Sequence, residues 1–77
     1  MSLSLGNLQV NEKGKVVGYA GESGAYREKL LAMGLTKGAE FEVVRVAPLG
    51  DPVEITLMGF NLSLRKGEAE ALLVERR

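Results

Sequence analysis

The sequence contains no histidine and no cysteine. Histidine is the usual general base of enzymes, and without histidine or cysteine no Ser-His or Cys-His nucleophile can be built. Without cysteine, no disulfide cross-links the fold and no thiolate binds a metal ion. The usual general base and the Ser-His and Cys-His nucleophiles are therefore missing, and we expect that this protein is not an enzyme.

The chain also has no excess of positive or negative charge. Ten basic and ten acidic side chains give a net charge of zero, and aromatic residues make up 5% of the chain. Nucleic-acid binders normally concentrate positive charge, because counterion release drives much of their affinity. Those that bind single strands also stack bases on aromatic side chains. Both observations argue against a nucleic-acid partner.

Long hydrophobic runs are absent as well. The longest apolar run, LLAMGL at 30–35, is far shorter than the ~20 residues that cross a bilayer. The first ten residues have neither a basic side chain nor the long apolar core of a secretion signal. We expect a soluble, cytoplasmic protein that does not insert into the membrane. The sequence leaves open whether the protein forms homo-oligomers.

The 77 residues suffice for a single domain, residues 1–77, with a compact core. Ten glycines divide the chain into short pieces that are typical of a small β-rich fold. We expect turns at 13–14, 48–52 and 59–61. The propensities and alternation predict about five strands, at 15–19, 39–47, 53–58, 62–65 and 72–76.

Simple alternation makes specific predictions about which side chains face the core. In the strand at 53–58, Val53, Ile55 and Leu57 are expected to point inward. In the strand at 39–47, Phe41 and Val43 should share one face with Arg45, and Val44 and Val46 should share the other face with Glu42.

One helix, from about residue 24 to residue 33, is predicted between the first two strands. Tyr26, Leu30 and Met33 follow the spacing i, i+4 and i+7 and would share one face. Ser23 is positioned to cap the first turn. A short helical turn at 66–71 is expected before the last strand.

Two glycines mark the end of this helix and the turn that follows it. Gly34 occupies the position after the last periodic residue, where a left-handed conformation favours glycine, and Leu35 can fold back onto the last turn. Gly38 supplies the positive φ of a second turn. Because small sheets remove exposed edges by curling, we predict a mainly β protein, a small barrel with a helix across one end.

Metal binding would depend on oxygen ligands alone. Glu40, Glu42, Asp51 and Glu54 are close in sequence, and carboxylates suit hard ions such as Mg²⁺ and Ca²⁺. No segment resembles a calcium-binding loop. We expect no cofactor and no tight metal site, and leave open a weak, oxygen-ligated divalent ion.

Three motifs together resemble the FeoA family. They are L-x-x-M-G-L-x-x-G at 30–38, P-x-G-D-P at 48–52 and G-F-x-L-x-L-R-x-x-E-A at 59–69. Each motif alone is weak, but their order and spacing are specific. The resemblance covers nearly the whole chain, from about Leu5 to Val74.

The resemblance implies an SH3-like barrel and a role as a small accessory protein of bacterial ferrous iron uptake. Its expected partner is FeoB, a membrane permease with a cytosolic G-protein domain, which it would bind and modulate. The same domain type occurs at the end of iron-dependent transcriptional repressors. The alternative is therefore a free-standing regulatory or metal-sensing module. No helix-turn-helix precedes the domain in this sequence, which favours the transport accessory.

A partner-binding surface is predicted from apolar residues outside the expected core. Met58 continues a strand whose alternate residues point inward, and Phe60 follows in the expected turn. Leu31 is displaced by ~100° from the apolar face of the helix. Clustered exposed apolar side chains tend to mark protein contacts, so we expect Leu31, Met58 and Phe60 to form the contact set.

Three internal arginines, Arg27, Arg45 and Arg65, are candidates to act on the partner's nucleotide. Arg27 lies on the outer face of the predicted helix and would be free to reach a partner. Arg65 falls within the third motif, where an ion pair with Glu68 is the expected structural role.

Overall fold

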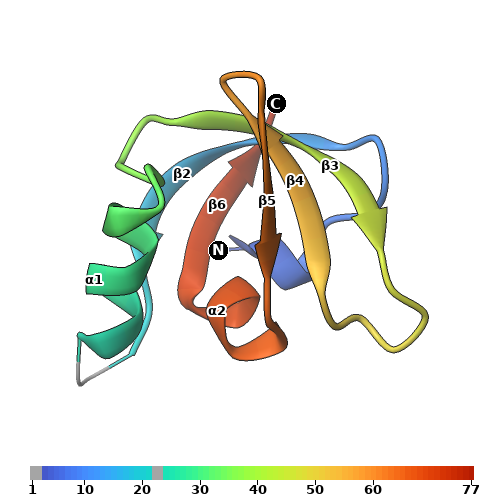
Figure 1. Cartoon of the computed structure of the whole chain (residues 1–77). Helices are drawn as coiled ribbons and strands as arrows, with labels where there is room; N and C mark the ends of the chain where they lie inside the picture. Colours follow the sequence, from blue (N-terminus) through green and yellow to red (C-terminus); the bar gives the residue numbers. More distant parts are fainter. Residues whose placement is uncertain (1–2, 22–23) are drawn as a thin grey trace.

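The computed structural model of the chain describes residues 3–21 and 24–77 (Figure 1). The predicted capping residue Ser23 lies outside the described residues. The elements follow in the order β1 (Leu3–Ser4), η1 (Leu5–Asn7, a 3-10 turn), β2 (Lys13–Tyr19), α1 (Ala25–Ala32), β3 (Glu40–Val46), β4 (Val53–Leu57), β5 (Phe60–Leu64), α2 (Lys66–Ala71) and β6 (Leu72–Arg76).

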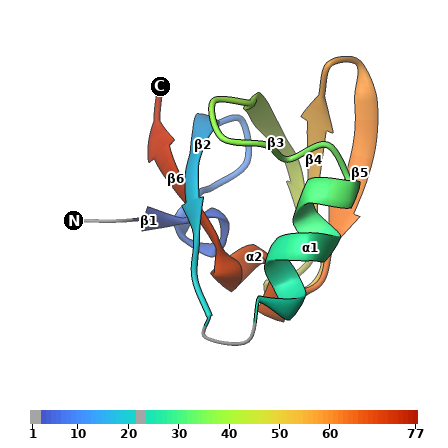
Figure 2. The same cartoon turned by 90° about the vertical axis from the view of Figure 1, so that its left-hand side faces the viewer.

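The strands form one antiparallel, six-stranded sheet with the spatial order β1-β6-β2-β3-β4-β5. The sheet curves strongly, and α2 packs near its open side, where it contacts β1, β5 and β6 (Figures 1 and 2). The predicted mainly β, SH3-like class is confirmed, with the short β1 as an additional strand. The barrel is not closed, because the edge strands β1 and β5 do not pair with each other.

The core fills the concave side of this sheet. The predicted inward residues of β4, namely Val53, Ile55 and Leu57, are all buried. Alternation in β4 is clean because β4 itself carries no extra residue, and its register with β5 runs unbroken from Val53 to Leu57. The other buried apolar residues are Leu5, Leu8, Val16, Leu30, Leu35, Phe41, Val43, Leu64, Ala69, Ala71, Leu72 and Val74.

A β-bulge in β3 overturns one prediction from alternation. Val43 pairs with Ile55 and Arg45 pairs with Glu54, so Val44 is an extra residue with no partner on β4. Beyond the bulge the faces exchange, because the added residue shifts the two-residue period by one. Val46 therefore packs against the core, whereas Arg45 is exposed, in contrast to the predicted arrangement.

Two turns lie a few residues from their predicted positions. The predicted turn at 13–14 is the beginning of β2, and the chain turns instead at Val10 and Asn11. The predicted turn at 59–61 is a two-residue hairpin loop of Met58 and Gly59, with φ of 51° and 84°. Phe60 is consequently the first residue of β5 and does not lie in the turn.

The prediction that Gly34 ends the helix in a left-handed conformation is confirmed. Gly34 has a φ of 95°. Its N–H donates to the carbonyl of Leu31, and the N–H of Leu35 donates to the carbonyl of Leu30, both at 3.0 Å. This is a Schellman arrangement. It turns the chain so that Leu35 is fully buried.

No helix within residues 3–21 and 24–77 has the length and apolar character needed to cross a membrane.

Close packing around Gly14 on β2 generates a stability prediction. A Cβ at this position would lie 2.7 Å from Cζ of Phe41 and 3.2 Å from the backbone oxygen of Glu75. We expect Gly14→Ala to lower the free energy of unfolding by about 1–3 kcal/mol, because overpacking a tight site forces its neighbours to shift. Urea unfolding measures this loss.

Gly18→Ala on the same strand is the matched control. Its added Cβ would meet Cδ1 of Leu73 at 3.8 Å, an ordinary contact. Equal stabilities of the two variants would contradict the packing around Gly14.

Candidate functional site

An apolar groove lies between the C-terminal end of α1 and the β4–β5 hairpin. It has a volume of about 360 Å³. None of its lining residues within 3–21 and 24–77 is charged. We call this site the apolar groove, and its lining residues are Met33, Gly34, Leu57, Met58, Phe60, Asn61 and Leu62.

The rim of the apolar groove is unusually exposed for apolar side chains. Met58 is 88% exposed and Phe60 is 72% exposed. Met58 also adopts the left-handed conformation of the hairpin loop, which is uncommon for a residue other than glycine, asparagine or aspartate. Two large apolar side chains are thus exposed to solvent at the rim of the apolar groove.

The predicted contact set is only partly brought together. Met58 and Phe60 both line the apolar groove. Leu31 is 38% exposed on α1, but it does not line the groove. Arg27 is exposed on α1, with its guanidinium 6.0 Å from the centre of the Tyr19 ring, and it does not line the groove either.

Other side chains of the apolar groove belong to residues that also pack against the core. Met33, on the predicted helix face, and Leu62, on β5, are both partly buried. They contribute to the groove because the barrel remains open beside β5. Alternating patterns identify which residues face inward, but they carry no signal for an opening in the barrel.

Burial and a hydrogen bond fix the segment of chain beside the groove. The Tyr19 hydroxyl donates to the carbonyl of Leu35 at 2.6 Å. Gly34 lies so near β4 that a Cβ on it would be 3.5 Å from Cδ2 of Leu57. These contacts hold the end of α1 against the sheet and fix one wall of the groove.

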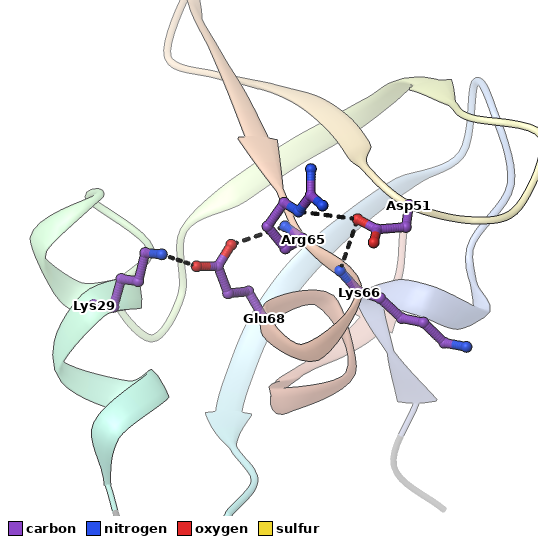
Figure 3. Close-up of polar contacts among 5 residues, drawn as sticks. All are labelled: Lys29, Asp51, Arg65, Lys66 and Glu68. Atoms are coloured by element: carbon purple, nitrogen blue, oxygen red, sulfur yellow. Dashed lines mark hydrogen bonds and ion pairs between the residues drawn. The ribbon is translucent and has the colours of Figure 1, made fainter.

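Glu68 connects the two helices (Figure 3). Its carboxylate is buried, with one oxygen paired to the Lys29 ammonium on α1. The other oxygen accepts a hydrogen bond from the backbone N–H of Arg65 at 2.8 Å, at the start of α2. This second bond satisfies a donor that the helix itself leaves unpaired. Glu68 therefore positions α1, and with it the groove, relative to α2.

The expected ion pair between Arg65 and Glu68 is not formed by their side chains. The Arg65 Nε instead lies 3.4 Å from Oδ1 of Asp51, which also accepts from the backbone N–H of Lys66 at 3.2 Å (Figure 3). The motif residues Asp51, Arg65 and Glu68 thus fasten the β3–β4 loop and α1 to the beginning of α2.

The hydrogen bond from Lys29 holds the pKa of the Glu68 carboxyl below its ordinary value. Burial opposes this shift, whereas the Arg65 N–H supports it. The balance indicates that the charged form is the one that the fold stabilises.

The acidic side chains considered as metal ligands lie apart or face arginines. Glu40 is paired with Arg77, and Glu54 lies 4.0 Å from Arg45. Within residues 3–21 and 24–77, no three acidic side chains are grouped so that they could hold a metal ion.

A second, larger hollow of about 500 Å³ lies between η1, the β3–β4 loop and α2. Polar side chains such as Asn7, Lys66 and Glu70 line it. Leu49 on its edge is 90% exposed, but no other large apolar side chain among the described residues lines this hollow. It is therefore a weaker candidate for a protein-binding site than the apolar groove.

The curved sheet, the inserted helix and the groove define a small SH3-like domain. The FeoA domain model matches residues 3–76, and the chain belongs to this family. The FeoA family is associated with ferrous iron transport.

A fusion of Fe(2+) transport protein A and the Fe(2+) transporter FeoB from Porphyromonas gingivalis is 36% identical over 73 residues. The match covers 95% of this chain and 8% of that relative. The chain therefore spans only a small part of the curated relative that it matches.

Solved structures show the same fold. A FeoA-like protein from Clostridium acetobutylicum has a TM-score of 0.87 at 40% identity, covering 97% of this chain and 86% of that chain. Zinc-complexed FeoA from Stenotrophomonas maltophilia has a TM-score of 0.78 at 25% identity, with 95% and 89% covered. A manganese-dependent transcriptional repressor has a TM-score of 0.89 at 13% identity, with 99% and 37% covered, a likeness that concerns the fold alone.

Glu68 generates a prediction about acid stability. A carboxyl whose pKa is lowered by folding stabilises the protein above its unfolded pKa, and this contribution is lost as pH falls through the folded pKa. We expect Glu68→Gln to cost about 1.5–3 kcal/mol at pH 7, the range for a hydrogen bond to a charged group. The difference from wild type should shrink below the ordinary pKa of 4.5. Urea unfolding between pH 7 and pH 3 measures both effects.

Glu70→Gln on the same helix is the control, because Glu70 is exposed and forms no ion pair with another described residue. A pH-independent cost of Glu68→Gln would show that the carboxylate's charge is not what stabilises the helix contact.

Proposed function

We propose that this protein is a cytoplasmic accessory of bacterial ferrous iron uptake that binds and modulates the FeoB permease through its cytosolic G-protein domain. The observation that carries the proposal is the fusion relative, in which a domain similar to this chain is joined to FeoB in one polypeptide. Two domains that occur within one chain in one organism often work together as separate chains in another.

The apolar groove supports a role in binding. Exposed large apolar side chains that cluster on a small domain tend to mark protein contacts. Met58 and Phe60 form such a cluster over an uncharged hollow. Leu31 and Arg27, exposed on α1, extend the proposed partner-facing surface beyond the groove.

A metal-sensing module is the second candidate. The zinc complex of the Stenotrophomonas maltophilia relative favours it. It requires direct, saturable binding of a divalent ion by the isolated protein, which calorimetry with Fe²⁺, Mn²⁺ and Zn²⁺ would show. The transport accessory does not require such binding.

The proposed contact set can be tested with one triple variant. We expect Leu31→Ser, Met58→Gln and Phe60→Ser together to weaken binding to cognate full-length FeoB by at least about tenfold, or 1.4 kcal/mol, as the loss of interface anchors does. Calorimetry with detergent-solubilised FeoB measures the affinity.

Leu49→Gln is the matched control, since Leu49 is as exposed as Met58 but lies at the opposite end of β4. A folded triple variant that binds as tightly as wild type would reject the contact set. Absence of binding by the wild-type protein would reject the proposed partner.

A further inference from the structure

β5 has one free edge. It is the last strand of the sheet, with β4 on one side and no strand on the other. An unpaired edge presents a row of backbone donors and acceptors to which another extended chain can add. The apolar groove beside this edge is lined by Phe60, Asn61 and Leu62 of β5, and by Met33 and Gly34 at the C-terminal end of α1.

The register identifies which backbone groups are free. The loop of Met58 and Gly59, with both φ positive, is a type I′ hairpin whose closing pair, Leu57 and Phe60, is hydrogen-bonded. Hydrogen-bonded pairs then recur at every second residue. The backbone N–H and C=O of Asn61 and Ser63 consequently point away from β4.

Nothing in the described chain covers these groups. No backbone hydrogen bond from another segment of residues 3–21 and 24–77 reaches Asn61 or Ser63. Ser63 is exposed. β5 also lacks the lysine or proline that commonly protects an edge strand from pairing.

The groove beside this edge limits the chemistry of the occupant. An added strand would place alternate side chains on the side of the sheet to which Phe60 and Leu62 point. That side opens into the groove, which no charged residue lines. The occupant should therefore be extended and carry uncharged, apolar side chains at alternate positions.

We propose that β5 and the apolar groove bind an extended apolar segment of the permease by β-strand addition. The segment pairs with the free backbone groups of Asn61 and Ser63 and inserts an apolar side chain beneath Phe60. This inference rests on the proposed function, because it assigns the mode by which FeoB is bound.

Ser63→Pro tests the pairing directly. Proline removes the outward N–H at this position, and an edge strand tolerates it because that N–H does not bond to β4. We expect Ser63→Pro to bind cognate full-length FeoB at least about tenfold more weakly than wild type. Ser63→Ala, which keeps the N–H, should bind as wild type does.

Hydrogen exchange provides a second, mutation-free measurement. In the complex of wild-type protein and FeoB, exchange of the Asn61 and Ser63 amides should slow at least about tenfold relative to the free protein. A contact made by side chains alone would not form hydrogen bonds to these amides. This readout holds even if Ser63→Pro fails to fold.

The outcomes separate the two proposals. If wild type binds FeoB while Ser63→Pro binds equally well and neither amide slows, strand addition is overturned and the proposed function stands. If wild type does not bind FeoB, the proposed function fails. A dimer of this chain that Ser63→Pro abolishes would overturn the permease segment in favour of a second copy.

Discussion

The contact between Glu68, Lys29 and the start of α2 determines where the inserted helix lies. Leu30 is the buried residue of α1, so apolar packing alone anchors this helix at a single turn. The Glu68 side chain is 4% exposed, and an unpaired charge at that depth would be unfavourable. Its two oxygens are satisfied from different elements, and this pairing favours the arrangement in which α1 lies close to α2.

The apolar groove follows from this placement. The sheet is curved but open, and α2 with η1 occupies the space near β1 and β6. α1 is fastened to α2 and to the end of β2 through Tyr19 and Leu35, and it stands beside β5 without pairing with it. A helix cannot satisfy the backbone of an edge strand. The groove between α1 and β5 therefore remains apolar, and the outer backbone groups of β5 remain available for hydrogen bonding.

Local patterns were sufficient for most of the fold. Alternation identified the inward residues of β4, and glycine spacing identified the end of α1. The bulge at Val44 could not be predicted, because an extra residue does not visibly change the sequence pattern of a strand that is apolar on both faces. The sequence does not predict the contact between Lys29 and Glu68 either, since the two residues are far apart in sequence. For the candidate site, Met58 and Phe60 are exposed as expected, but Phe60 lies on β5 and not in the expected turn. The groove beside them depends on how α1 docks.

Leu49 and Met58 are about equally exposed, but their surroundings differ. Leu49 stands alone among polar neighbours, and single exposed apolar residues are common in soluble proteins. Met58 lies beside Phe60 over an apolar hollow, and its backbone adopts a conformation that glycine or asparagine would adopt at lower cost. Neither the strain nor the exposure stabilises the isolated domain. The combination of an exposed apolar rim and a left-handed Met58 is consistent with the proposal that a partner fills the groove.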